Sequence, residues 1–138
     1  MVLEWNQLAV QAVGQARVSP VVASRALAIT QAAVYDAVNA IDRSFAPYFA
    51  DVHASRGASP EAAAAQAAHD TLAALFPSQA STFDAALAAD LAGIPADQAS
   101  QGVAVGKEVA RQILDWRSTD GSGPGNGSAS NARRYPFA

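Results

Sequence analysis

The two histidines are the residues of this chain best suited to acid–base chemistry or to metal binding. His53 lies close to Asp51 in a stretch without helical periodicity, and we expect these two residues to form a solvent-exposed pair. His69 falls beside Leu72 and Phe76 on the apolar side of a predicted helix, which favours a partly buried, hydrogen-bonded structural histidine. Neither histidine belongs to an HExxH sequence or has a second histidine one helical turn away. The sequence therefore predicts no zinc site at either position.

The carboxylates are scattered along the chain rather than grouped. Asp36 and Asn39 lie one turn apart on a predicted helix and could hold a neighbouring loop or a cation, and the loop interpretation is favoured. Asp84 and Asp90 lie too far round their helix to converge. The sequence contains no nucleophile elbow, phosphate-binding loop or dinucleotide-binding glycine pattern. We therefore predict no catalytic, cofactor-binding or metal-ligating residue in this chain.

Length and composition indicate one compact domain or a piece of a larger one. The chain has 138 residues, of which 51% are hydrophobic and 15% charged, so a substantial core can form. The net charge is −3 and Lys107 is the single lysine, so no basic stripe is expected and nucleic-acid binding is disfavoured. The absence of cysteine excludes disulfides and thiolate metal sites.

The sequence shows no segment expected to cross or to enter a membrane. The longest uncharged interval runs from Thr71 to Phe83 and contains Pro77. The N-terminal residues have neither the basic nor the apolar part of a signal peptide. Because a mature sequence that restarts with methionine would look the same, the compartment stays open, and a secreted or periplasmic location is compatible with the sequence.

Proline, glycine and apolar periodicity predict an all-α bundle of about five helices. Ser19-Pro20 and Ser59-Pro60 each combine a capping residue with proline at the first helical position. Asp97 is a candidate cap for the last helix. The segment 43–58 between the second and third helices is expected to be irregular and to be held by Phe45, Tyr48 and Phe49. The helices are expected over residues 2–16, 20–42, 60–75, 79–92 and about 97–117.

The segment Ala23–Asp42 has the clearest amphipathic pattern. Leu27, Ile29, Ala33 and further aliphatic residues fill one half of the helix surface, and the other half carries most of the polar residues among small alanines. The last helix has Gly102 and Gly106 one turn apart on its apolar face. Glycine within a helix costs about 1 kcal/mol relative to alanine. This pair therefore indicates a neighbouring backbone that passes close by, unless the two are glycines tolerated at the surface.

The composition changes at Thr119, where a Gly-, Ser- and Asn-rich stretch begins. We therefore divide the chain into a helical bundle over residues 1–118 and a flexible linker or exposed arm over residues 119–138. The arm is expected to lead toward further protein. Its Asn126-Gly127-Ser128 triplet matches the glycosylation pattern, which is common by chance.

Four segments resemble one family in order and with similar spacing over nearly all of residues 2–121. These segments are VLEWNQLA, ASRALAITQAAVYDAVNAID, SPEAAAAQAAHDTLAALFPSQASTFDAALAADLAGIP and DGS. They resemble the N-terminal helical half of bacterial vanadium-dependent haloperoxidases, in the type 2 phosphatidic acid phosphatase superfamily. The most specific part is YDAVNAID, from Tyr35 to Asp42. The resemblance implies an all-α fold and an oxidoreductase or phosphatase whose active centre binds vanadate or phosphate.

The family's chemical motifs are absent from this sequence. The resemblance implies a K-x6-R-P motif, a P-S-G-H segment and an S-R-x5-H motif, whose cations and backbone N–H groups hold the oxyanion. Lys107 has no Arg-Pro at the required distance, and Arg133-Arg134 is followed by Tyr-Pro-Phe rather than by a histidine. Because these motifs follow the linker in the family, vanadate or phosphate is expected in a catalytic half beyond Ala138. We expect the chain alone to be inactive.

Two functional interpretations remain open from the sequence. In the first, the chain is the N-terminal structural portion of such an enzyme and packs against the remainder of the polypeptide. In the second, it is a free-standing helical module for self-association or protein interaction, with a second copy of the chain as partner in a homo-oligomer. The substrate and the halide preference are not encoded in these residues.

Overall fold

The computed structural model describes residues 2–42, 50, 52, 54 and 57–119. These residues form five α-helices and one short 3₁₀-helix and contain no strand, which confirms the predicted all-α bundle. The predictions for the loop aromatics, for the His53–Asp51 pair and for residues 120–138 lie outside the described residues. The elements are α1 (Val2–Ala16), α2 (Pro20–Asp42), α3 (Pro60–Leu75), the 3₁₀-helix η1 (Pro77–Gln79), α4 (Ala80–Ala92) and α5 (Ala96–Thr119).

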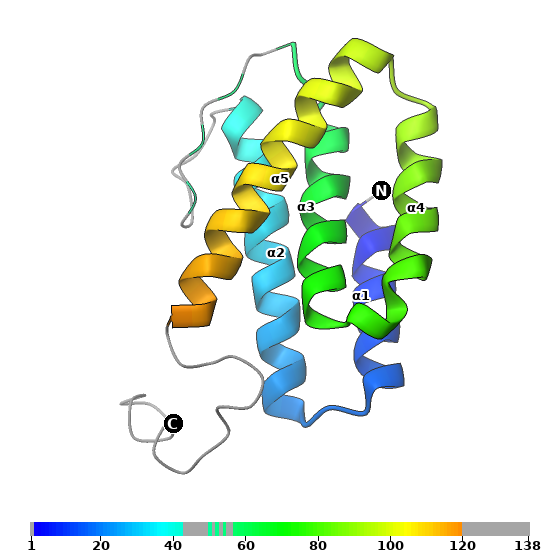
Figure 1. Cartoon of the computed structure of the whole chain (residues 1–138), viewed down its shortest axis with the longest axis vertical. Coiled ribbons are helices and arrows are strands. Elements are labelled where there is room, and N and C mark those ends of the chain that lie inside the picture. Colours follow the sequence, from blue (N-terminus) through cyan, green and yellow to red (C-terminus); the bar gives the residue numbers. More distant parts are fainter. Residues whose placement is uncertain (1, 43–49, 51, 53, 55–56, 120–138) are drawn as a thin grey trace.

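The helix α3 is the centre of the bundle and contacts all four other α-helices. The pairs α1–α2 and α3–α4 run antiparallel, and α5 crosses α2 and α3 obliquely (Figure 1). Every residue from Ala62 to Ala68 is buried, and all but Gln66 are alanine. Small side chains on all sides allow several helices to approach one helix closely, so α3 can be covered around its circumference.

Two apolar clusters form the core on either side of α3. The first joins α2, α3 and α5 and includes Ile29, Val109 and Ile113. The second lies mainly between α1, α3 and α4 and includes Trp5, Leu72 and Phe83. Residues of α1 and of α5 thus face these clusters, whereas Ala16 is exposed at the end of α1.

The glycines of α5 lie directly against the backbone of α3. A Cβ atom at Gly102 would lie 2.5 Å from the Ser59 carbonyl oxygen, and one at Gly106 would lie 2.5 Å from the Ala63 carbonyl oxygen. Such distances are shorter than van der Waals contact, so no side chain fits at either position. The predicted close approach of a neighbouring backbone is confirmed, and that neighbour is α3.

The helix starts agree with the predicted caps in two cases out of three. The Ser19 hydroxyl accepts a hydrogen bond from the Val22 amide (3.3 Å), and the Ser59 hydroxyl accepts one from the Ala62 amide (3.1 Å). The prediction for Asp97 is wrong, because α5 begins one residue earlier, at Ala96, and the Ala99 amide donates to the Pro95 carbonyl at 2.8 Å. Asp97 therefore lies in the first turn, where its charge faces the positive end of the helix dipole.

One helix of the described part, α2, is long and apolar enough to cross a membrane by length and composition. It contains no long uncharged interval, because it carries Arg25, Asp36 and Asp42. In the bundle 33% of its most apolar window is buried. A core helix of a soluble protein passes the same test, as does a signal sequence, so this property is weak evidence for a membrane span.

Candidate functional site

Asp36 on α2 is almost completely buried, with 1% of its surface exposed. Its Oδ2 atom accepts a hydrogen bond from the Ala50 amide at 2.7 Å, across the connection between α2 and α3. Asn39, one turn further on, is also buried, whereas Tyr35, the residue before Asp36, is exposed. The half of α2 predicted to be polar is therefore not a uniform solvent-facing surface.

The hydrogen-bond partner of Asp36 supports the favoured interpretation of this residue as a loop anchor. The Ala50 amide donates to the carboxylate, which is the loop interpretation. Within the described residues no group of three or more His, Cys, Asp or Glu side chains is placed so that it could hold a metal ion. Asp36 thus anchors the connection between α2 and α3.

His69, in the second half of α3, lies between two carboxylates. Its Nδ1 atom is 2.8 Å from Oδ1 of Asp70, and its Nε2 atom is 2.6 Å from Oδ1 of Asp84 on α4. Oδ1 of Asp70 also accepts a hydrogen bond from Nε2 of Gln66 at 2.7 Å. The His69 side chain is 16% exposed and that of Asp84 is 67% exposed. The expectation of a partly buried, hydrogen-bonded histidine is confirmed.

This geometry favours the doubly protonated ring. A neutral imidazole has one N–H donor, whereas an imidazolium donates from both nitrogens and can satisfy two carboxylates at once. Burial lowers the pKa of His69, but the hydrogen bonds to Asp84 and Asp70 and their negative charges raise it more, so the pKa lies above 6.5. The cluster therefore retains a proton at higher pH than a free histidine would.

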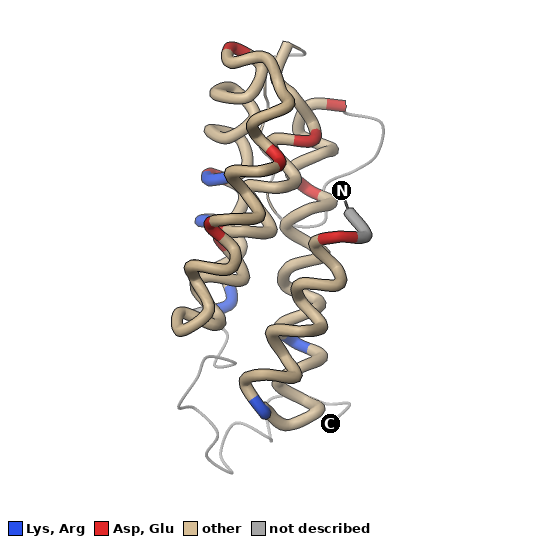
Figure 2. The backbone as a smooth tube through the Cα atoms, turned by 90° about the vertical axis from the view of Figure 1, so that its right-hand side faces the viewer, with Lys and Arg blue, Asp and Glu red and all other residues tan. Residues whose placement is uncertain are grey.

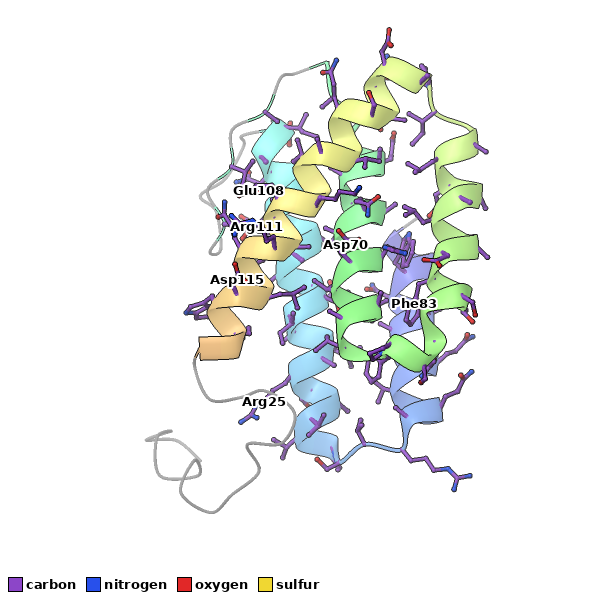
Figure 3. The ribbon with its side chains drawn as sticks, in the orientation of Figure 1. Arg25, Asp70, Phe83, Glu108, Arg111 and Asp115 are labelled. Carbon is purple, nitrogen blue, oxygen red and sulfur yellow. The ribbon has the colours of Figure 1, made fainter. Side chains whose placement is uncertain are left out.

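His69, Asp70 and Asp84 line an open cavity of about 490 Å³ between α3, α4 and α5. Its apolar wall comes from α4, and Lys107 of α5 lies at its exposed side. Asp70 is seen on α3 in Figure 3. The lining residues are Gln66, His69, Asp70, Asp84, Leu87, Ala88, Leu91 and Lys107. The two carboxylates engage both ring nitrogens of His69, so among the described residues no cation in this cavity has its donors free to converge on an oxyanion except the exposed Lys107.

The contact between His69 and Asp84 is not among the sequence predictions, although the spacing of the two residues around Pro77 indicates it. The two residues lie at nearly equal distances along the chain from Pro77, so an antiparallel helix pair that turns at Pro77 places them level. Asp84 and Asp90 do not converge, as expected. Asp90 instead accepts a hydrogen bond from Nε1 of Trp5 at 2.8 Å, which links α1 to α4.

A second charged group lies on the exposed surface of α5. Arg111 pairs with Glu108 at 2.6 Å and with Asp115 at 3.0 Å, at i,i+3 and i,i+4 spacing (Figure 3). Hydrogen bonds from Arg111 and Gln112 lower the pKa of Glu108 to about 2. Such exposed pairs are common on helix surfaces and contribute little to stability.

The charges of the described residues also form no continuous basic surface. Acidic residues lie mainly toward the end of the bundle that holds the α4–α5 connection, and basic residues lie mainly toward the other end (Figure 2). Nucleic-acid recognition requires clustered Lys and Arg to neutralise phosphates. The described surface provides no such cluster.

Comparisons of the chain with protein-family models, with curated proteins and with solved structures found no match. The class of protein that the fold defines is therefore an all-α bundle built around a central alanine-rich helix.

Proposed function

We propose that this chain is the N-terminal structural portion of an enzyme similar to the vanadium-dependent haloperoxidases and their acid phosphatase relatives. The observation that carries the proposal is the resemblance of Tyr35–Asp42 and its neighbouring segments to that family. The all-α fold is compatible with it. In this proposal the chain packs against a catalytic bundle that supplies the oxyanion site, and the buried polar residues of the chain stabilise its fold.

The roles of the buried polar residues support a structural function. Asp36 belongs to the most specific part of the resemblance; it is buried and accepts a hydrogen bond from the Ala50 amide. A buried carboxylate that holds a loop stabilises one conformation of that loop, and its loss leaves a buried donor unpaired. The segment that resembles the enzyme family therefore contributes to the shape of the bundle.

The proposal is tested directly by the transcript from which the chain is translated. We expect an open reading frame that continues from residue 138 into a second helical region with K-x6-R-P, S-G-H and S-R-x5-H motifs. A stop codon after Ala138, with no such frame fused to it or encoded beside it, would contradict the proposal.

The isolated chain is expected to bind neither vanadate nor phosphate and to have no haloperoxidase or phosphatase turnover. An oxyanion site of this kind needs several cations and N–H donors that converge. In the described residues Lys107 instead shares its cavity with Asp70 and Asp84. Isothermal titration calorimetry with vanadate and with phosphate measures this, with an active haloperoxidase as positive control. Saturable micromolar binding of either anion would show that the chain has an oxyanion site of its own.

The alternative is a free-standing module for self-association, and exposed apolar side chains favour it. Val10 on α1 and Val21, Val22 and Tyr35 on α2 are large hydrophobic residues that lie exposed, with Val21 63% exposed. Exposed apolar surface is removed from water when a second copy or another partner covers it.

We expect the isolated chain to form dimers or larger oligomers as its concentration rises. Light scattering coupled to size-exclusion chromatography should show an increasing average mass, and Val21→Glu should lower that increase because it places a charge on the exposed apolar surface. Gln101→Glu, at an exposed position on α5, is the matched control and should leave the mass unchanged. A wild-type chain that stays monomeric at high concentration would contradict self-association.

A further inference from the structure

The helix α4 packs against α3 but buries few of its own residues. Phe83 is its one buried residue. Ala86 and Leu87 are partly buried against the same cluster. Two polar contacts also connect α4 to the other helices in the described part: Trp5 donates to Asp90, and His69 contacts Asp84. A helix with few buried residues and exposed partners is the kind of element that opens locally at low cost. The ionisation of one contact can therefore change how firmly α4 is held.

The contact between His69 and Asp84 depends on the second proton of the ring. With both ring nitrogens protonated, His69 donates to Asp70 within α3 and to Asp84 on α4. After one proton is lost, one nitrogen presents a lone pair to a carboxylate, and that contact becomes repulsive. Asp70 is the next residue in the same helix and is also held by Gln66, whereas Asp84 is mostly exposed and can turn into solvent.

We propose that His69 is a proton-dependent latch that holds α4 against α3 when its ring is protonated and releases Asp84 when the ring is neutral. Release frees the edge of α4 that lines the cavity between α3, α4 and α5. The charged groups that face this cavity with His69 are Asp70 from α3, Asp84 from α4 and Lys107 from α5. Because Lys107 is exposed, solvent weakens its repulsion of the protonated ring, and the two carboxylates dominate.

The direction of the pH dependence follows from the raised pKa of His69. A group whose folded pKa lies above its unfolded value contributes its full stabilisation below the unfolded pKa, which is 6.5 here. That stabilisation is lost as the pH rises through the folded pKa. The latch is therefore closed in mildly acidic solution and opens at higher pH. If the pKa of His69 in the closed state lies one unit above its unfolded value, the equilibrium constant for the release of α4 changes about tenfold across this pH range.

Two measurements on the full chain test the latch. An NMR titration of the histidine ring signals gives the pKa of His69, and a His53→Gln variant assigns which signal belongs to His69. Hydrogen exchange measured from about pH 6 to about pH 8.5, where ordinary carboxylates stay ionised, gives protection factors corrected for the intrinsic rates. We expect a pKa above 6.5 and a several-fold loss of protection in α4 over this range, with little change in α3.

Asp84→Asn keeps the shape of the side chain and removes its charge, and its exposed position allows the variant to fold. It should lower the pKa of His69 and remove the extra pH dependence of α4. Asp90→Asn is the matched control on the same helix: it alters the contact with Trp5, so α4 protection falls equally at all pH values and the pKa of His69 stays unchanged. A pKa of His69 at or below 6.5 in the wild type would overturn the proposal. Hydrogen-exchange protection of α4 that changes with pH in the same way as that of α3 would also overturn it.

Discussion

Replacement of Gly106 by alanine is expected to destabilise the fold by about 2–3 kcal/mol, although alanine favours helix more than glycine. The new Cβ atom would lie 2.5 Å from the Ala63 carbonyl oxygen and 2.7 Å from Cβ of Gln66. Both neighbours belong to α3, and the nearer one is a backbone atom that cannot rotate away. The helices α3 and α5 must therefore separate, and the apolar cluster that joins α2, α3 and α5 loses contact along its length.

Urea denaturation followed by circular dichroism measures this effect, because the five helices give a strong signal. Gly14→Ala in α1 is the matched control, since a Cβ atom there would meet nothing within 4 Å. At that exposed site the helical preference acts alone and should increase stability by up to about 1 kcal/mol. The close-packing account of Gly106 fails if its alanine variant is as stable as the wild type.

Replacement of Phe83 by alanine is expected to cost about 3–5 kcal/mol, the largest effect predicted for a single side chain. Phe83 is 1% exposed and lies in the cluster formed by α1, α3 and α4, together with Trp5, Leu72 and Phe76. Figure 3 shows its side chain on α4 within the bundle. Because it is the one buried residue of α4, its removal leaves a cavity and also loosens the whole helix.

Thermal or urea unfolding gives the loss of stability, and hydrogen exchange shows whether it is concentrated in α4. Leu87→Ala is the control on the same helix: its side chain is partly buried, so its truncation should cost about 1–2 kcal/mol. Phe83→Leu should retain most of the packing and cost less than about 2 kcal/mol. If Phe83→Ala costs no more than Leu87→Ala, α4 is held by contacts other than this ring.

Local sequence signals predicted the helices well because each signal acts between residues close in the chain. Ser19-Pro20 and Ser59-Pro60 start α2 and α3 through hydrogen bonds that reach only three residues ahead. The prediction that Asp97 caps the last helix is wrong because α5 already begins at Ala96, directly after Pro95, and a one-residue difference leaves the local pattern almost unchanged. The glycine pair predicted that a backbone comes close, but it could not name that backbone.

The central position of α3 and the cluster around His69 could not be predicted in the same way. The alanine run of α3 has almost no contrast between its faces, so its pattern does not show which helices cover it. His69 and Asp84 belong to different helices, and each looked ordinary in its own segment. Asp84, one of the two carboxylates that raise the pKa of His69, reaches the ring because the turn at Pro77 brings α4 back along α3.

The sequence by itself determined where the helices run and which of their faces are apolar, because helix formation and capping depend on neighbours within one or two turns. The tertiary structure alone decided which helices meet. It placed Gly106 against Ala63, and it gave Asp36 the Ala50 amide as a partner and His69 a second carboxylate. These contacts join residues on different elements, and their energies depend on distances that no local pattern contains.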